Sequence, residues 1–241
     1  MRRGDVGRYV FMPGDPGRVP LIAAHLDGPR EVARNREFLT YTGLLDGVPV
    51  SVTSTGIGAP STAIAAEELI AIGADTLIRV GTAGSIAKDL RTGDLVIAQG
   101  SVRDEGTSAA YVPPIYPAVA DLEIVNSLVT AAERRERRHR TGIIRSADSF
   151  YADVAPETMP YIQYPMTVWQ GSHVLASEME ASTLFVIAWL RQVRAGAIVA
   201  VVNATEEHVD TAEVGRLSLE PLIETAIDAV RILIESDGAK G

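Results

Sequence analysis

The apolar positions of the chain form short buried runs and longer segments with helical spacing. Apolar or β-branched runs bounded by glycine, proline or aspartate predict strands at residues 9–12, 38–44, 48–54, 76–85, 94–104, 142–148 and 195–203. Apolar residues three or four positions apart predict helices at 19–26, 60–73, 119–134, 178–194 and 217–236. This alternation predicts an α/β fold of one domain, 1–241, with a mixed or mostly parallel sheet covered by helices on both faces.

Turn and capping residues place several boundaries. Asp46-Gly47 is a strong signal for the tight turn of a β-hairpin between two of the predicted strands. Asp15 is a favourable N-cap, and Pro16 suits the first position of the helix that follows. The segment 152–173 contains three prolines and is expected to form a long surface loop. Loops of that length usually serve a function or move.

Composition and charge narrow the function classes. The 241 residues are 46% hydrophobic and can bury a large core. A net charge of -9 argues against a nucleic-acid-binding surface, and the one charge run, at 133–140, is expected to be a solvated helix end. The absence of cysteine excludes disulfides and thiolate chemistry. No leader and no long apolar run suggests export or a membrane span, which predicts a cytoplasmic protein without membrane partners.

The stretch GDPGR at 14–18 has two interpretations. It can simply cap the helix that follows the first strand. An arginine in the first turn, however, opposes the helix dipole unless an anion is present, and the two glycines leave backbone N–H groups accessible. The residues therefore leave open whether Gly14 and Arg18 only form a cap or also bind an anion.

Arg79 lies inside the apolar strand predicted at 76–85. A buried guanidinium is costly unless it is paired, so Arg79 needs an anionic partner, either a structural carboxylate or a ligand. The strand is expected to break into a glycine turn at 81–84. The N–H groups of such a turn, the Thr82 hydroxyl and guanidinium groups together suit the oxygens of phosphate.

Further polar features fall at predicted strand ends or turns, where ligand sites of α/β sheets gather. They are Arg36 in NREF and the acidic stretch EME at 178–180. Gly56-Ile57-Gly58 begins like a dinucleotide-binding motif, but the third glycine is missing. Tight helix–strand packing is therefore the preferred interpretation of these glycines.

Eight motifs along the chain resemble, in order, those of a known family. They are PGDPGRV, NREF, STGIGAPSTAIAAEEL, IRVGTAGSI, RTGDLVIAQGSVRDEGTS, YPAVADLE, SADSFY and SEMEAS. This order resembles the hexameric nucleoside phosphorylases, closest to the uridine phosphorylases, over most of the chain from Pro13 onward. The resemblance implies a single α/β domain with a central distorted barrel-like sheet. It also implies a hexamer built as a trimer of dimers, with active sites shared between neighbours.

The resemblance also implies roles for individual residues. Phosphate is expected on Gly14, Arg18, Arg79 and Thr82, with Arg36 reaching in from an adjacent subunit. The residues expected to contact the nucleoside are Thr82, Ala83, Gly84, Phe150, Glu178, Met179, Glu180 and Asn203. Among them, Phe150 packs on the base, and Met179 and Glu180 hold the ribose. The expected catalytic residues are Arg79, Arg18 and Glu180. Without the resemblance, Glu180 reads as an exposed carboxylate at a helix start.

Potassium is the one metal ion that the resemblance brings in. Glu37, Ile57 and Ser61 match positions that hold this ion between subunits in uridine phosphorylases. No cofactor other than phosphate as co-substrate is expected, and no His, Cys and Asp cluster has transition-metal spacing. The family also carries a histidine further upstream of the PGDP turn than this chain extends. We therefore expect the true start of the protein to lie upstream of Met1.

The chain departs from the family where the base is read. Val154 and Pro156 stand where uridine phosphorylases carry a glutamine and an arginine, and neither can make their hydrogen bonds. Ala204 stands where purine enzymes have an aspartate and uridine enzymes an arginine. Residues that could compensate are Asn203, Thr205, Glu206, Gln163 and Glu157. The departing base is thus left open.

The expected activity is phosphorolysis of a nucleoside to free base and (deoxy)ribose 1-phosphate, uridine phosphorylase-like by lineage. The partners are then a nucleoside and phosphate, with no nucleic acid. One alternative is a purine nucleoside phosphorylase of the same fold, and another is a nucleoside-binding protein that has lost catalysis. A nucleosidase that uses water is disfavoured, because Arg18, Arg36 and Arg79 are all present.

Overall fold

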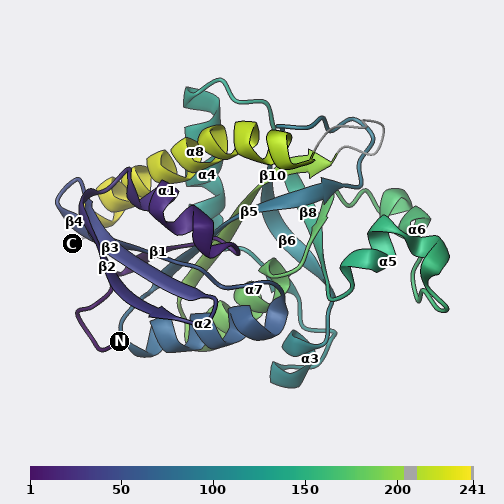
Figure 1. Ribbon diagram of the computed structural model, residues 1–241, viewed down its shortest axis with the longest axis horizontal. Coiled ribbons are helices and arrows are strands. Elements are labelled where there is room, and N and C mark those ends of the chain that lie inside the picture. The colour runs from purple at the N-terminus through teal and green to yellow at the C-terminus, as the bar shows by residue number, and fades with distance from the viewer. Residues whose placement is uncertain (204–210, 240–241) are drawn as a thin grey trace.

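The computed structural model describes residues 1–203 and 211–239, which form one mixed sheet surrounded by helices (Figure 1). The strands are β1 (Tyr9–Met12), β2 (Asp27–Asn35), β3 (Phe38–Leu45), β4 (Val48–Thr53), β5 (Thr76–Ser85), β6 (Leu95–Asp104), β7 (Ala118–Val119), β8 (His139–Ala147), β9 (Ala176–Glu178) and β10 (Arg194–Asn203). The helices are α1 (Val19–Ala23), α2 (Ala59–Ala71), α3 (Thr107–Tyr111), α4 (Leu122–Arg134), α5 (Phe150–Val154), α6 (Met166–Gly171), α7 (Ala181–Arg191) and α8 (Thr211–Ala239), with short 3-10 helices η1 (Pro16–Arg18) and η2 (Pro156–Thr158). Within the described residues, no helix combines the length and apolar character needed to cross a lipid bilayer.

Five strands close into a barrel-like ring. β5 pairs with β9, then β8, β6 and β10 follow in order, and β10 returns to pair with β5. The β5–β9 and β6–β10 pairs are antiparallel, and the other three are parallel. The remaining long strands extend from β5 in the order β1, β4, β3 and β2. The expected mixed, distorted barrel-like sheet is confirmed.

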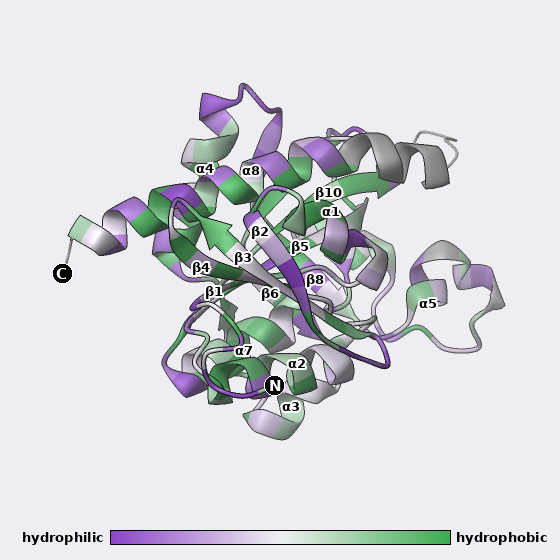
Figure 2. Ribbon diagram, turned by 60° about the vertical axis from the view of Figure 1, so that its left-hand side comes forward, coloured by the Kyte–Doolittle hydropathy of each residue, from purple (hydrophilic) through white to green (hydrophobic). Residues whose placement is uncertain are grey.

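Helices cover the ring on two sides. α8 packs on β10 and α4, while α7 packs against the strands on the other side with α2 beside it (Figure 1). α7 is apolar almost all round, and Leu184, Phe185 and Val186 are fully buried. A helix of that composition is stable only inside a core. Figure 2 shows the same distribution, with the hydrophobic strands β5 and β10 lying between the helices.

The hairpin signal at Asp46-Gly47 is confirmed. Both residues have positive φ, 51° and 81°, and they connect β3 to β4. Positive φ at both central residues matches the turn type whose twist suits a hairpin. The cap signal is confirmed too, since the Asp15 carboxylate accepts a hydrogen bond of 2.8 Å from the Gly17 N–H at the start of η1.

Some elements differ from the sequence prediction. β2 was not predicted because its sequence, DGPREVARN, has no apolar alternation. It lies at the exposed edge of the sheet, where β3 is its one partner among the described strands (Figure 2). The helix expected at 178–194 begins at Ala181, because the residues before it form β9. The helix expected at 19–26 ends at Ala23, and β7 and α3 were also missed.

The segment 152–173 is not the featureless loop that its prolines suggested. It contains the end of α5, η2 and α6. Pro156 is the first residue of η2, and Pro165 is the N-cap of α6. Proline suits both positions because neither needs a backbone N–H donor. The prolines therefore start short helices here.

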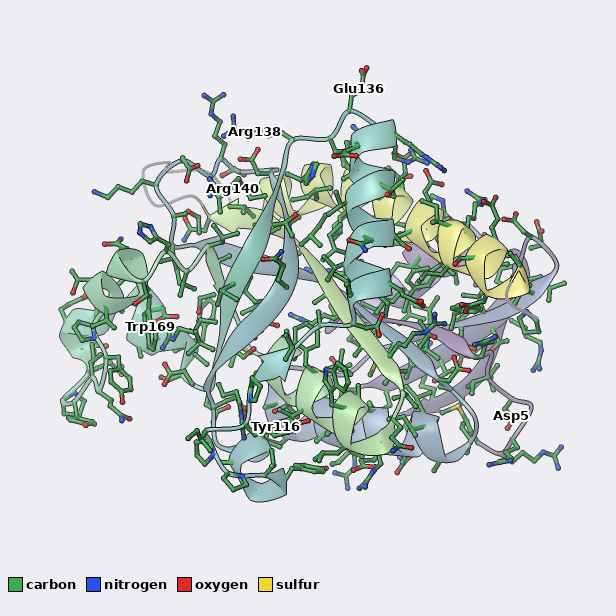
Figure 3. The ribbon with its side chains drawn as sticks, turned by 180° about the vertical axis from the view of Figure 1, so that it is seen from behind. Asp5, Tyr116, Glu136, Arg138, Arg140 and Trp169 are labelled. Carbon is green, nitrogen blue, oxygen red and sulfur yellow. The ribbon has the colours of Figure 1, made fainter. Side chains whose placement is uncertain are left out.

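The charge run at 133–140 lies at the end of α4 and is mostly exposed, as expected, but it also makes ion pairs within the fold. Arg135 pairs with Glu224 at 2.7 Å and with Asp228 at 2.5 Å, so α4 is tied to α8 by ion pairs. Arg138 donates to the Asp94 carboxylate at 2.8 Å. Figure 3 shows Arg138 beyond the end of α4. Much of the positive charge in this run is therefore neutralised within the fold.

Candidate active site

The loops after β1 and β4 come together beside β5. β1 pairs with β5, with Met12 opposite Arg79. Beyond the end of β1, the Gly56 N–H donates to the Gly14 carbonyl at 2.9 Å, which continues the pairing between the two loops. The expected anion-binding residues Gly14 and Arg79 are thereby brought to one place, although 65 positions separate them in the sequence.

Arg79 is buried between two carboxylates. Its side chain is 6% exposed, its Nε donates to Glu178 at 2.6 Å, and its Nη2 lies 2.5 Å from a carboxylate oxygen of Glu180. Burial opposes the charged form, but the charges of Glu180 and Glu178 outweigh it and raise the pKa of Arg79. The structural salt bridge that the buried position required is thus present. The guanidinium stays charged at any working pH.

One nitrogen of Arg79 has no partner. Nη1 is buried and makes no hydrogen bond to any described residue. It faces Gly14, because a β-carbon placed on this glycine would lie 3.9 Å from it. A buried, charged donor without an acceptor is costly, and such groups need an explanation. Nη1 is therefore the donor that an anion beside Gly14 would engage.

Arg18 supplies a second guanidinium. Its Nη2 donates to the Thr82 hydroxyl at 3.4 Å. Burial is the main cause that lowers the pKa of Arg18, and the positive charge of Arg79 lowers it further, while Asp15 and Glu180 act in the opposite direction. Two guanidinium groups close enough to repel each other favour an anion between them. Gly14, Arg18, Arg79 and Thr82 thus form one cluster.

Glu178 holds Arg79 and the start of α7 in place. Its side chain is fully buried, and its carboxylate accepts hydrogen bonds from the backbone N–H groups of Glu180 at 2.9 Å and Ala181 at 3.1 Å. The Ser146 hydroxyl also donates to it. With this many donors, the Glu178 carboxylate is a positioning group for Arg79.

Glu180 is the N-cap of α7 and is buried, contrary to the exposed position that the residues alone suggested. Its Oε1 accepts from the Gly58 N–H at 2.6 Å. Burial is the main cause that raises the pKa of Glu180, and the charge of Arg79 partly offsets it. This carboxylate therefore faces the cluster with a reduced preference for the charged form.

The glycine turn expected at 81–84 is wrong. These residues remain in β5 and pair with β10, from Gly81 opposite Val199 to Gly84 opposite Asn203. Their backbone groups belong to the sheet rather than to an anion-binding turn. Ala83 is buried, and the Thr82 hydroxyl is what this stretch offers to an anion.

The other expected nucleoside contacts lie around this end of the sheet. Met179 lies between the two glutamates and is half-buried, and Asn203 is exposed beside Gly84. Phe150 begins α5 and is 58% exposed. Pro156 is in η2, and Val154 ends α5. Among residues that could read the base, Gln163 and Glu157 are exposed, whereas Ala204, Thr205 and Glu206 lie outside the described residues.

Arg36 lies apart from the cluster. It occupies the exposed turn between β2 and β3 with a φ of 53°. None of the contacts described for Arg18 or Arg79 involves it. A role at the anion site would require Arg36 to act on a neighbouring copy of the chain.

Glu37, Ile57 and Ser61 do come together. A β-carbon on Gly56 would lie 2.5 Å from Cγ of Glu37 and 3.3 Å from the Ser61 hydroxyl, which itself donates to the Ile57 carbonyl at 3.1 Å. Carboxylate, hydroxyl and carbonyl oxygens suit a hard cation. In the described part of the chain, no group of three His, Cys, Asp or Glu side chains could hold a metal ion.

The site also contains a second buried arginine that was not predicted from the sequence. Arg145 in β8 pairs with Asp104 and with Asp153. The signal that singled out Arg79, an arginine inside an apolar strand, is also present in GIIRSAD. Ser146, which donates to Glu178, was missed as well, because a serine in a strand carries no pattern of its own.

The chain is similar to known proteins over most of its length. Residues 8–228 match the model of the phosphorylase superfamily. The chain is 43% identical to the uridine phosphorylase of Treponema pallidum, over 100% of this chain and 95% of that protein. It is 42% identical to the guanosine phosphorylase of Halorubrum lacusprofundi, over 82% and 79% of the two chains. The crystal structure of uridine phosphorylase from Vibrio fischeri superposes with a TM-score of 0.86 at 32% identity, covering 95% of this chain and 94% of that one.

Proposed function

The chain belongs to the phosphorylase superfamily, and we propose that it catalyses the phosphorolysis of a nucleoside to free base and pentose 1-phosphate, in the manner of a uridine phosphorylase. The observation that carries this proposal is Nη1 of Arg79, which is buried, charged, directed at Gly14 beside Arg18, and without a hydrogen-bond partner among the described residues. A binding site for the phosphate dianion explains why such a donor persists in the fold.

The chemistry needs an anion at this position. When the C1′–N bond breaks, its electron pair leaves with the base and positive charge develops on the sugar. A phosphate oxygen forms the new bond to C1′, so phosphate is both nucleophile and counter-charge. Holding the two reactants together can supply roughly 7 to 11 kcal/mol of the barrier reduction, without a nucleophile from the protein.

The residues divide this work. Gly14, Arg18, Arg79 and Thr82 bind the phosphate, and Glu178 orients Arg79. Glu180 faces the same space and accepts hydrogen bonds from the ribose hydroxyls, with Met179 beside it. Because Glu180 already accepts a bond from the Gly58 N–H and contacts Arg79, it links the sugar to the phosphate site.

The base is most simply uracil, since the chain resembles uridine phosphorylase over its full length. A second candidate is a 6-oxopurine, favoured by the likeness to a guanosine phosphorylase and by Val154 and Pro156 at the expected uracil-reading positions. The third candidate, a binding protein without catalysis, is opposed by the intact cluster around Arg79.

The proposal extends to assembly. We expect a homohexamer built from dimers, in which Arg36 of one subunit completes the phosphate site of its neighbour. Its exposed position in the β2–β3 turn supports this arrangement. The oxygen donors of Glu37, Ile57 and Ser61 would hold potassium, which would bridge subunits as a structural ion. A cytoplasmic location stays a prediction.

The test is base release from uridine, thymidine, inosine, guanosine and adenosine, each with and without phosphate, by the parent and by Arg79→Ala. The parent should release at least one base only with phosphate, and Arg79→Ala should lose this activity while its far-UV circular dichroism stays the same. Release without phosphate would indicate a nucleosidase. Nucleoside binding without any release would favour the binding protein.

A further inference from the structure

Arg145 is a second buried arginine with an elaborate set of partners. Its side chain is 7% exposed. Nε donates to Asp104 at 2.7 Å, Nη2 lies 2.6 Å from the same carboxylate, and Nη1 donates to both oxygens of Asp153 at 2.8 and 2.7 Å. Two carboxylates on one guanidinium leave a net negative charge.

The strand register places Arg145 on the same face of the sheet as the proposed nucleoside contacts. Arg145 lies opposite Ser177, Ser177 opposite Gly84, and Gly84 opposite Asn203. Residues directly opposite on neighbouring strands point to the same face. The 3.3 Å hydrogen bond from Arg145 Nη1 to the Ser177 hydroxyl agrees with this. Arg145, Ser177 and Asn203 therefore form a polar row across four strands.

Space lies over this row, and the phosphate cluster lies next to it. A β-carbon on Gly84 would meet no atom of the described residues within 4 Å, so these residues leave the middle of the row open. Thr82 precedes Gly84 by two positions, and alternate strand residues share a face. Because Thr82 accepts the hydrogen bond from Arg18, the open space over Gly84 adjoins the proposed phosphate site.

Asp153 reaches this row from α5. Its carboxylate accepts from the Ser177 hydroxyl at 2.9 Å as well as from Arg145, and its side chain is 23% exposed. Phe150, the expected base-packing residue, precedes it by three positions, so both lie on one face of α5. The α5 and α6 segment lies beside β8 (Figure 1), and Trp169 belongs to α6 (Figure 3). The centroid of the Trp169 ring lies 5.2 Å from Cζ of Arg145.

Asp153 has capacity for a further donor. A carboxylate offers about four acceptor positions, and the described contacts use those facing Arg145 and Ser177. An ionised carboxylate only accepts, so its ligand must supply an N–H or O–H. Uracil at N3, and hypoxanthine and guanine at N1, carry a ring N–H next to a carbonyl. Cytosine and adenine carry a lone pair at the equivalent ring nitrogen.

We propose that Asp153, oriented by Arg145 and Ser177, reads the ring N–H of a base that carries a carbonyl beside it, and so excludes cytosine and adenine. The inference rests on the proposed function, because it takes Phe150 and Gly84 as nucleoside contacts. It supplies a base-reading group where Val154 and Pro156 provide none. It also accounts for similarity to both a uridine and a guanosine phosphorylase, whose named bases share this group.

The test compares two matched pairs, uridine with cytidine and inosine with adenosine. Dissociation constants are measured by calorimetry for the parent, Asp153→Asn, Ser177→Ala and the control Glu133→Gln, which changes an exposed carboxylate in α4. The parent and Glu133→Gln should favour uridine and inosine by roughly tenfold or more. Asp153→Asn should lose most of this preference. Ser177→Ala, which leaves the ion pair with Arg145 in place, should reduce it less.

Equal weakening of all four nucleosides in Asp153→Asn would show that the carboxylate only fastens α5, and would overturn the inference. A parent that binds adenosine as well as inosine would overturn it too, even if phosphate-dependent base release is observed. The parent could prefer uridine and inosine, and lose this preference in Asp153→Asn, without releasing any base in the presence of phosphate. That result would support base reading by Asp153 and refute the proposed phosphorolysis. Binding of none of the four nucleosides would refute both.

Discussion

Gly81 lies under the Arg79 guanidinium, and adding one methyl group there should displace it. A β-carbon on Gly81 would lie 2.8 Å from Cζ and Nη2 of Arg79 and 3.2 Å from Nη1. Ordinary contact between such atoms begins at about 3.5 Å, so the guanidinium must move by about 0.7 Å. That shift lengthens its bonds to Glu178 and Glu180, 2.6 and 2.5 Å in the parent, and misplaces Nη1.

We expect Gly81→Ala to lower kcat/KM for phosphate by about 100-fold, equivalent to about 2.7 kcal/mol, because misplacements near 1 Å have this effect. Nucleoside affinity without phosphate should change much less. The assay is initial-rate phosphorolysis across a phosphate titration. The control is Gly238→Ala, since a β-carbon there meets no atom of the described residues within 4 Å. A folded Gly81→Ala with parental kcat/KM would refute the claim that Arg79 geometry controls phosphate use.

Two further predictions concern stability. Asp237→Asn should reduce the free energy of unfolding by about 1 to 2 kcal/mol at neutral pH, since hydrogen bonds from Arg194 lower the pKa of Asp237 and solvent screens part of the interaction. In urea titrations, the difference in free energy of unfolding between the parent and Asp237→Asn should have its full value above about pH 4 and should vanish as the pH falls below the lowered pKa of Asp237. A difference that does not change with pH would contradict this prediction. Gly196→Ala should reduce the free energy of unfolding by about 1 to 3 kcal/mol, because its β-carbon would lie 2.3 Å from Ile124. In thermal unfolding, the same substitution should cost less in an Ile124→Ala background than in the parent. An equal cost in both backgrounds would show that the defect is unrelated to Ile124.

The fold could be predicted where burial leaves a pattern. The strand that ends at Met12 is a continuous apolar run, and the strand that ends at Ser85 is mostly apolar. The hairpin at Asp46-Gly47 has a local cause in its turn residues. β2 is exposed on the sheet edge and β9 is only three residues long, so neither carries a periodic signal. The ring closure between β5 and β10 depends on distant pairing that no local pattern encodes.

The site could be predicted only in its charged parts. Arg79 stands out because a strand buries it, but the sequence does not say whether a carboxylate or a ligand answers its charge. In the structure, Nε and Nη2 of Arg79 contact Glu178 and Glu180, whereas Nη1 contacts no acceptor among the described residues. Carboxylates therefore pair with two of the nitrogens, and the third is left for a ligand. Asp153 could not be identified from the sequence. Its proposed role depends on its contact with Arg145 and on the register of β8 with β9, which the tertiary structure determines.

In the proposed reaction, the cluster around Arg79 brings phosphate to the sugar. The most direct measurement is the identity of the sugar product, followed by 31P NMR during the reaction of uridine or guanosine with phosphate. We expect pentose 1-phosphate in amounts equal to the free base, and neither product with Arg79→Ala. Free pentose formed at the same rate whether or not phosphate is present would contradict it.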